Sequence, residues 1–414
     1  MFTNIDDTLN WLYTQKKQNR RENLDRIKFC AEALDLIPSY KIVHLAGTNG
    51  KGSTAKILST ILSLKGKKVG LFVSPFVIKF NERIQINNEY ITDEEILEYI
   101  NTLYQFQNEY KEKYNDTIPF FELTFLMALM HFKKNNIEIG IIECGMGGRL
   151  DATNFLNSDL SIITNVGFDH MNVLGNTLEE IANHKLGIAK SNITCLTCVS
   201  DELKTMFDEY AKDNNINMKH VDEYVSDINL SNKTYFKYKG INYSSALLGT
   251  YQAYNASLAV EAAYLIDDTL TINEIQKGLD NTFWPGRLEM IRNNPRVLID
   301  GAHNIHGIDA LVNTIKNLYP DNKINIVFTA LHDKEYKKMI DSLNEITNKY
   351  YFTSINDLRA TDINEFINIT NINSEVISDF KECINKAIND LNDEILIITG
   401  SLHFISMVRE YLKK

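Results

Sequence analysis

Apolar and polar residues alternate along this chain with two different periods. From Lys41 onward, short runs rich in β-branched residues are followed by longer segments with helical spacing. This alternation favours an α/β fold with mostly parallel strands. The run KIVHLA at 41–46 predicts a strand, and the segment 53–66 predicts a helix with its apolar residues on one face. Further strands are predicted at 68–75, 137–145, 160–167 and 193–200.

The length of the chain and a second alternation indicate two domains. A chain of 414 residues exceeds the roughly 250–300 residues at which single cores usually stop growing. After WPGRLEM at 284–290, strands and helices alternate again to the C-terminus, which is typical of a doubly wound unit. We therefore predict a larger domain of residues 1–290 around a parallel sheet and a smaller Rossmann-like domain of residues 291–414. Within the first, the polar segment 212–243 predicts short antiparallel strands and loops.

Composition and charge exclude several classes of protein. A net charge of −11 gives no diffuse positive field that would attract nucleic acid or an anionic membrane. The one basic run, KKQNRR at 16–21, is interpreted as a solvated helix end or loop. The N-terminus has no positively charged leader, and the most apolar segment, 120–132, is too short to span a bilayer and predicts a buried helix. We expect a cytoplasmic protein without nucleic-acid or membrane partners.

Cysteine usage indicates a reducing compartment. The chain has five cysteines, an odd number, and only Cys195 and Cys198 are close in sequence. Alternation along a strand would turn these two to opposite faces, and no histidine stands at metal-binding spacing. Both are therefore interpreted as core residues.

The stretch HLAGTNGKGST at 44–54 predicts a phosphate-binding loop, although its spacing differs from the common signature. A strand enters it, a helix leaves it, and its glycines permit backbone angles that point successive N–H groups at an anion. The positive end of the helix dipole adds to this. Lys51 would reach the outer phosphates, and Ser53 or Thr54 would offer a hydroxyl to magnesium. The alternative is a glycine-rich turn with a surface lysine.

Acidic residues follow two other predicted strands. Glu143 ends a buried run, at the carboxyl end of a strand where ligands of open α/β sheets bind. Such a carboxylate is placed to bind magnesium, although an acid solvated at a loop mouth is the alternative. Asp169 and His170 follow the next strand, where a hydrogen-bonded structural pair is the simpler interpretation.

The remaining candidates are more ambiguous when taken alone. Nothing local distinguishes Lys185 and Lys190 from surface lysines. Gln252 and Asn255 share one face of a predicted helix, where they would read a base or cap the helix. Three further groups are expected at the cleft between the two domains: Arg287, Asp300 with His303, and the loop of Gly400, Ser401 and His403, for which loop packing is the simpler interpretation. Together the motifs indicate an ATP- and magnesium-dependent enzyme.

Several motifs occur in an order that identifies a family. They are AGTNGKGST, SPFVIKFNERIQIN, FFELT, ECGMGGRLDATN, ITNVGFDH, IANHKLGIAK, WPGRLE and DGAHN. From about Lys41 to the C-terminus, the chain resembles folylpolyglutamate synthases and dihydrofolate synthases, a branch of the Mur ligase superfamily. The resemblance implies a central-type ATP-binding domain followed by a glutamate ligase domain. In this family the loop with the inserted Gly52 is the usual form.

The resemblance also implies a reaction. ATP phosphorylates a carboxylate, the amine of L-glutamate attacks the resulting acyl phosphate, and an amide forms as ADP and phosphate leave. The acceptor would be dihydropteroate, reduced folates or both, and a monomer is usual. The chain departs from the family pattern in the segment 15–26 and at Tyr251, where the family often has histidine.

Site residues follow from the same resemblance. Nucleotide contacts would come from Gly47, Thr48, Asn49, Gly50, Lys51, Gly52, Ser53, Thr54, Asn255, Arg287, Asp300 and His303, with Asp300 on the ribose. Ser53 and Ser74 would bind one magnesium ion, and Glu143 with His170 a second. Lys185 would carry a carbamate that reaches magnesium. Lys51, His170, Lys185 and Arg287 would act in catalysis, and the folate side would be contacted by Phe121, Glu122, Thr124, Arg149 and Asp151.

Two rival functions remain open on the sequence. A peptidoglycan precursor ligase of the same superfamily would share the loop, Glu143 and His170, but would place a nucleotide-sugar domain before the loop. A small-molecule kinase or a non-catalytic ATP-binding module would use ATP without any dependence on glutamate.

Overall fold

The computed structural model describes residues 1–16 and 23–413. The chain forms two compact units. One consists of Met1–Tyr224 with Tyr254–Asn281, and the other of Val225–Ala253 with Thr282–Lys414. Most of the basic run at 16–21, which is interpreted as a solvated helix end or loop, lies outside the described residues.

The first unit is built on an eight-stranded sheet in the order β4-β3-β2-β5-β1-β6-β7-β8. Strands β2, β5, β1, β6, β7 and β8 are parallel to one another. Strands β3 and β4 add an antiparallel edge next to β2. The five strands predicted in this region are confirmed. The bounds are β1 (Lys41–Ala46), β2 (Val69–Phe72), β3 (Ile84–Ile86), β4 (Glu89–Tyr90), β5 (Ile139–Glu143), β6 (Leu160–Ile163), β7 (Thr194–Thr197) and β8 (Asn217–His220).

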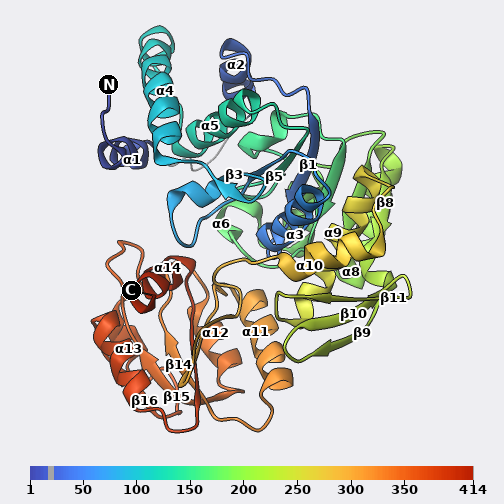
Figure 1. Ribbon diagram of the computed structural model, residues 1–414. Coiled ribbons are helices and arrows are strands. Elements are labelled where there is room, and N and C mark those ends of the chain that lie inside the picture. The colour runs from blue at the N-terminus through green and yellow to red at the C-terminus, as the bar shows by residue number, and fades with distance from the viewer. Residues whose placement is uncertain (17–22, 414) are drawn as a thin grey trace. The chain divides into compact units, whose positions relative to one another are not determined.

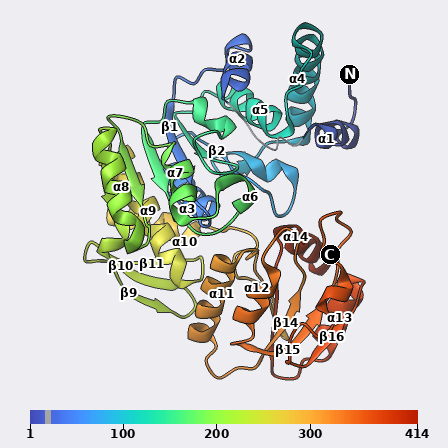
Figure 2. The same cartoon turned by 180° about the vertical axis from the view of Figure 1, so that it is seen from behind.

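Helices cover this sheet, and α1, α2, α4 and α5 gather on one side of it (Figures 1 and 2). Helix α5 is the buried helix predicted at 120–132, and no helix in the described ranges is long and apolar enough to cross a membrane. The helices are α1 (Ile5–Thr14), α2 (Asp25–Ala33), α3 (Lys51–Leu64), α4 (Asp93–Tyr114), α5 (Phe120–Lys134), α6 (Met171–Leu174), α7 (Leu178–Leu186), α8 (Asp201–Asp213) and α10 (Ile272–Asn281), with single turns η1 (Phe80–Arg83), η2 (Ala152–Phe155) and η3 (Val221–Tyr224).

Helix α3 differs from its prediction in one respect. The sequence predicts a one-sided apolar face, but every residue from Ser53 to Leu62 is buried. The reason is that α3 packs between the sheet and α10, where a Cβ on Gly278 would lie 2.8 Å from the Cα of Ile61. A helix that follows a phosphate loop is thereby held rigidly on both sides.

The second unit contains two sheets. Its main sheet has the order β12-β13-β17-β14-β15-β16, in which only β12 is antiparallel, as predicted for a doubly wound fold. A three-stranded antiparallel sheet, β9 to β11, confirms the strands predicted before Tyr243. The strands are β9 (Val225–Leu230), β10 (Thr234–Tyr238), β11 (Ile241–Ser245), β12 (Glu289–Asn293), β13 (Arg296–Ile299), β14 (Ile324–Phe328), β15 (Thr347–Phe352), β16 (Ser374–Val376) and β17 (Ile395–Thr399). The helices are α11 (Ile305–Leu318), α12 (Tyr336–Leu343), α13 (Phe380–Asn389) and α14 (Leu402–Leu412), with the turn η4 (Ile363–Phe366).

The division into units differs in detail from the predicted domains. The second unit resumes at Thr282, close to the predicted boundary after residue 290, but it also includes residues 225–253. Leu248 packs against the core of the second unit, which explains why this segment clusters there. Helix α9 (Thr250–Ile266) contributes residues to both units.

All five cysteines are free thiols. Burial raises the pKa of Cys195 to about 12, and burial also raises the pKa of Cys198. The burial of Cys195 agrees with its interpretation as a core cysteine, whereas Cys198 follows the end of β7 and is only partly buried.

Candidate active site

The predicted phosphate loop connects β1 to α3, and Gly50 forms its last residue. Gly50 precedes the first residue of α3 and has a φ of +84°, a conformation that residues with a Cβ rarely adopt. A Cβ on Gly50 would lie 2.3 Å from Oδ1 of Asn255 in α9. Asn255, itself buried, therefore lies directly against the loop, which the sequence could not show.

The Lys51 side chain curls back over the loop. Its Nζ donates to the carbonyl oxygen of Gly47 at 2.9 Å and to that of Thr48 at 3.2 Å. The ammonium is thus held above the loop, at the positive end of α3, where phosphate oxygens are favoured.

The loop following β6 fixes part of this backbone. Thr48 N donates to the carbonyl oxygen of Asn165 at 3.2 Å, and Asn49 N donates to Oδ1 of the same asparagine at 2.9 Å. Thr164 Oγ1 donates to the Asn49 carbonyl oxygen at 2.6 Å. The N–H groups of Thr48 and Asn49 are therefore occupied within the protein. Those at the start of α3, on Lys51 and Gly52, have no partner earlier in the helix and are the ones that a phosphate would meet.

We expect Gly50→Ala to raise the KM for ATP by about 10- to 100-fold, because the new methyl group displaces Asn255 and the loop together. Gly66→Ala is the matched control, since Gly66 also has a positive φ, +95°, but a Cβ there would meet nothing within 4 Å. Steady-state kinetics with varied ATP measure the difference. A KM for ATP that is no higher in Gly50→Ala than in Gly66→Ala would contradict the expected importance of the close packing at Gly50.

The structure brings Glu143 and Ser74 together at the carboxyl end of the sheet. Glu143 ends β5 with only 4% of its surface exposed, and its Oε2 accepts a hydrogen bond from Ser74 N at 3.0 Å. Strands β2 and β5 are parallel neighbours, so the residues that follow them meet at one edge.

The side chains at this edge of the sheet suit magnesium better than a metal ion whose ligands all come from the protein. Among the described residues, no group of three or more His, Cys, Asp or Glu side chains could hold a metal ion. Magnesium is usually bound by one or two carboxylates together with waters and substrate phosphates. Glu143 and the hydroxyls of Ser53 and Ser74 are side chains of the kind that such a site requires.

His170 and Asp169 lie beyond β6. His170 is exposed, stands directly before α6 with a φ of +51°, and donates its backbone N–H to Asp169 Oδ1 at 2.8 Å. Asp169 thus orients the backbone at His170. This hydrogen bond agrees with the interpretation of the two residues as a hydrogen-bonded structural pair.

Lys185 is not a surface lysine, so that interpretation of the local sequence is wrong. It lies in α7 and is 2% exposed. Burial lowers the pKa of Lys185 to about 7, the positive charge of Lys51 acts in the same direction, and Cys144 and Asp169 oppose it. At this pKa a substantial fraction of the amine is neutral near pH 7, and a neutral amine is a nucleophile, unlike the cation of an ordinary lysine.

Close backbone packing explains why Lys185 is buried. Arg149 N donates to the carbonyl oxygen of His184 at 2.7 Å, and a Cβ on Gly148 would also lie 2.7 Å from that oxygen. A Cβ on Gly187 would lie 2.5 Å from the Cα of Arg149. The ECGMGG segment therefore lies tightly against the end of α7. Lys190 also has a structural contact, because its Nζ donates to Asn154 Oδ1 at 2.7 Å.

The residues predicted on the folate side are mostly engaged within the first unit. Phe121 packs on Gly145, whose Cβ would lie 2.7 Å from the ring. The Thr124 hydroxyl donates to the Phe120 carbonyl oxygen at 2.8 Å, and Asp151 Oδ2 accepts from Met146 N at 2.9 Å. Arg149 is exposed, and its guanidinium donates to the Asn183 carbonyl oxygen at 3.1 Å.

Glu122 forms a buried ion pair that the sequence did not predict. Arg26 of α2 donates to both of its carboxylate oxygens, at 2.9 and 3.0 Å, and Glu122 is 1% exposed. The pair joins α2 to α5. Glu122 therefore has a structural role. Its predicted contact with a substrate stays a prediction.

We expect Arg26→Met to lower the free energy of unfolding by about 2–3 kcal/mol, because it removes the ion pair that Arg26 forms with the buried Glu122 carboxylate. Lys133→Met is the control, since Lys133 and Asp35 form an ion pair in which 52% and 95% of the side chains are exposed. Its loss should cost less than about 0.5 kcal/mol. Urea denaturation measures both, and similar losses would contradict the structural importance of the buried pair.

A buried histidine next to these motifs was missed by the sequence analysis. His44 Nε2 lies 2.8 Å from Thr153 Oγ1 and 3.1 Å from Cys144 Sγ. Burial, and secondarily the charge of Lys190, lowers the pKa of His44 to about 3, so the ring is neutral at physiological pH. His44 therefore joins β1, β5 and η2 as a structural residue.

The second unit carries the other predicted nucleotide contacts. Asp300 follows β13 and accepts from Leu288 N and Ala302 N, each at 2.8 Å. Burial raises the pKa of Asp300, while Arg287 and these two N–H groups oppose the shift. Burial also raises the pKa of Tyr251. The charge of Asp300 raises this pKa further, and the charge of Arg287 lowers it. Arg287, Asp300 and Tyr251 thus form one local cluster. Next to it, His303 Nδ1 donates to the Gly301 carbonyl oxygen at 2.9 Å.

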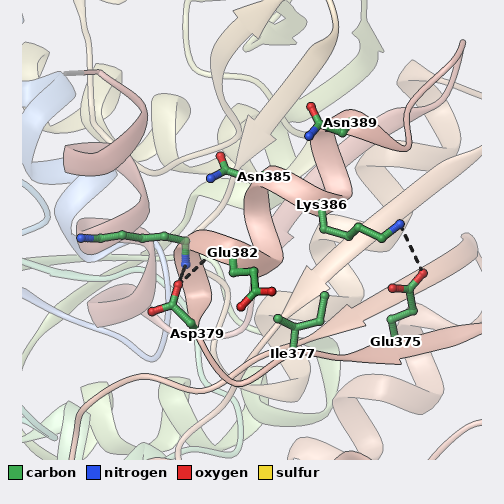
Figure 3. A pocket seen from close by; sticks show the side chains of 8 residues that line it. Glu375, Ile377, Asp379, Glu382, Asn385, Lys386 and Asn389 are labelled. Atoms are coloured by element: carbon green, nitrogen blue, oxygen red, sulfur yellow. Dashed lines mark hydrogen bonds and ion pairs between the residues drawn. The ribbon is translucent and has the colours of Figure 1, made fainter.

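The loop after β17 and a nearby surface pocket contain no further site residue. Gly400 N donates to the Ala302 carbonyl oxygen at 3.1 Å, and His403 Nδ1 lies 3.1 Å from Asp357 Oδ2, which agrees with loop packing. A pocket of about 720 Å³ lies along α13 and includes none of the predicted residues (Figure 3). It is lined by Glu375, Ile377, Asp379, Lys381, Glu382, Asn385, Lys386 and Asn389.

Comparison with known proteins agrees with this architecture. The chain matches the model of the Mur ligase middle domain over residues 45–263 and that of the Mur ligase, glutamate ligase domain, over residues 286–402. The class that the fold and these matches define is the Mur ligases. The chain is 34% identical to the dihydrofolate synthase/folylpolyglutamate synthase of Bacillus subtilis (strain 168), with 100% of both chains covered. It belongs to the folylpolyglutamate synthase and dihydrofolate synthase family of the Mur ligase superfamily.

Solved structures show the same similarity. One is a folylpolyglutamate synthase in complex with AMPPCP and folate, with a TM-score of 0.89, 28% identity and 100% coverage of both chains. Another is the bifunctional folylpolyglutamate synthase/dihydrofolate synthase of Yersinia pestis with AMPPNP and a manganese ion, with a TM-score of 0.88, 25% identity and coverage of 100% of this chain and 98% of that one.

Proposed function

We propose that this chain is an ATP-dependent ligase that joins the amine of L-glutamate to the carboxylate of folates or of dihydropteroate. The observation that carries the proposal is the grouping of the phosphate loop, Glu143 with Ser74, and the buried Lys185 within one unit. Relatives that are similar over the whole chain carry the corresponding names. A structural relative binds an ATP analogue together with folate.

The proposed reaction has two chemical steps. The acceptor carboxylate attacks the γ-phosphorus of ATP, which forms an acyl phosphate and releases ADP. The amine of L-glutamate then attacks the acyl carbon, the amide bond forms, and inorganic phosphate leaves with the carboxylate oxygen. The first step is needed because phosphate is a far better leaving group than oxide.

Within this reaction the loop binds the nucleotide. Lys51 and the first N–H groups of α3 would neutralise and orient the β- and γ-phosphates. Ser53, Ser74, Glu143 and His170 would hold divalent metal, which supplies charge neutralisation at the phosphates when bound. Asn255, Arg287, Asp300 and His303 are proposed as nucleotide contacts, and a second metal site is part of the same proposal.

Lys185 is proposed to carry a carbamate. The amine must be neutral to attack CO₂, and the low pKa of Lys185, about 7, supports this. The product is an anion on a long side chain, which can reach a metal ion that a lysine cation would repel. The amine loses a proton and one N–C bond forms, so the step needs no oxidant or further reactant.

The test of the proposed function is ADP release with each component omitted in turn. We expect ADP formation to require L-glutamate, divalent metal and either dihydropteroate or tetrahydrofolate, and assays with each acceptor separately define the substrate. ADP release with a peptidoglycan precursor, or release that does not depend on glutamate, would favour one of the rival functions and overturn the proposal.

A further inference from the structure

The segment between β2 and β3 is a loop closed by its own glutamate. Glu82 is 1% exposed and its carboxylate accepts from three successive backbone N–H groups, those of Val77, Ile78 and Lys79, at 2.9, 2.5 and 2.9 Å. The loop begins at Ser74, which donates its own N–H to Glu143. Its shape is therefore fixed at both ends by carboxylates.

This fixed loop holds Arg83 among aromatic rings. The guanidinium carbon lies 5.2 Å from the ring centre of Phe76, 5.7 Å from that of Phe80 and 5.5 Å from that of Phe120. Tyr13 of α1 stacks on Phe120 with ring centres 5.8 Å apart and continues the aromatic wall. We call Arg83 with Phe76, Phe80 and Phe120 the arginine cage.

Arg83 is buried, yet within the described ranges no side chain forms an ion pair with its guanidinium. It is 7% exposed, its Nε is buried without a hydrogen-bond partner, and no ion pair involves it among the residues that the structure describes. Burial lowers the pKa of Arg83 to about 10, while Tyr13, Glu143 and Glu82 raise it at longer range. Burying a cation without an anionic partner is costly, so such an arrangement is expected where a ligand supplies the partner.

The position of the arginine cage and its chemical groups indicate which ligand it would bind. The charge of Glu143 raises the pKa of Arg83. Glu143 lies at the carboxyl end of β5, and the phosphate loop begins at the carboxyl end of the neighbouring strand β1. The planar guanidinium fork matches a carboxylate, and the surrounding rings suit the apolar part of the acceptor next to that carboxylate, which is an aromatic ring in dihydropteroate. We propose that Arg83 binds the reacting carboxylate of the folate-type acceptor and orients it for phosphorylation. This inference rests on the proposed function, whose acceptor it assigns to the arginine cage.

The test compares an acceptor with its uncharged analogue. The probe is the acid that the wild-type enzyme glutamylates, dihydropteroate or tetrahydrofolate, and the same molecule with the reacting carboxylate replaced by a carboxamide. Kd values are measured by calorimetry with Mg²⁺ and a non-hydrolysable ATP analogue. We expect the wild-type protein to prefer the acid by about 10- to 100-fold, and Arg83→Met to bind acid and carboxamide about equally. Arg83→Lys should keep part of the preference, because it keeps the charge without the fork.

Lys79→Met is the matched control, since Lys79 is an exposed cation in the same loop. It should retain the full preference for the acid. A structural role of Arg83 alone would weaken binding of acid and carboxamide equally and leave the ratio intact, which would overturn the inference. If the wild-type protein glutamylates neither acid, the proposed function itself fails, so the two failures are distinguishable.

Discussion

Replacing Lys185 by alanine should lower kcat by about 10²- to 10³-fold, the loss expected when a group that stabilises transferring charge is removed. The proposed carbamate supplies an anion, which a small acid can replace in the space that the shorter side chain leaves. Acetate or propionate should therefore restore part of the activity of Lys185→Ala. Steady-state kinetics with increasing concentrations of these acids provide the measurement.

Lys190→Ala is the control for that experiment. Lys190 lies five residues further along the chain and contacts Asn154, so its loss should leave kcat nearly unchanged and insensitive to added acid. A Lys185→Ala enzyme that is fully active without any added acid would contradict the proposed role of this lysine.

Replacing Glu143 by glutamine should raise the Mg²⁺ concentration required for half-maximal activity by about 10- to 100-fold. The amide keeps the size of the side chain and its oxygen can still accept from Ser74 N, so the main change is the loss of negative charge. Titration of activity with Mg²⁺ at saturating ATP measures the effect.

Glu138→Gln provides the matched control, because Glu138 lies directly before the opposite end of β5 and 53% of its side chain is exposed. It should leave the Mg²⁺ requirement unchanged. Equal responses of the two variants would show that the charge of Glu143 does not contribute to metal binding.

The fold was largely predictable because its signals are local. Strand β1 and the glycines that follow it are contiguous in sequence, and so are the alternating elements of the second unit. The contacts that fix the loop are not local. Asn165 and Asn255 reach it from other elements, more than a hundred residues away, and no periodicity in the sequence encodes such a meeting.

Burial was the property that the sequence conveyed least well. Lys185 stands in an amphipathic helix that resembles a surface helix, and the close packing at Gly148 and Gly187 brings distant segments of the chain against the end of this helix. Glu122, which is predicted as a substrate contact, also accepts from Arg26 at both of its carboxylate oxygens, and nothing in the sequence indicates this ion pair. In both cases a charged side chain is buried by partners from distant segments, which a single sequence does not identify.

In the proposed reaction ATP activates the acceptor by phosphorylating its carboxylate, and oxygen labelling follows this step. The acceptor is prepared with ¹⁸O in the reacting carboxylate and incubated with ATP, Mg²⁺ and L-glutamate, and the phosphate released is analysed by mass spectrometry. We expect one ¹⁸O atom in inorganic phosphate for each amide bond formed. Amide formation that leaves all of the ¹⁸O outside the released phosphate would contradict the proposed reaction.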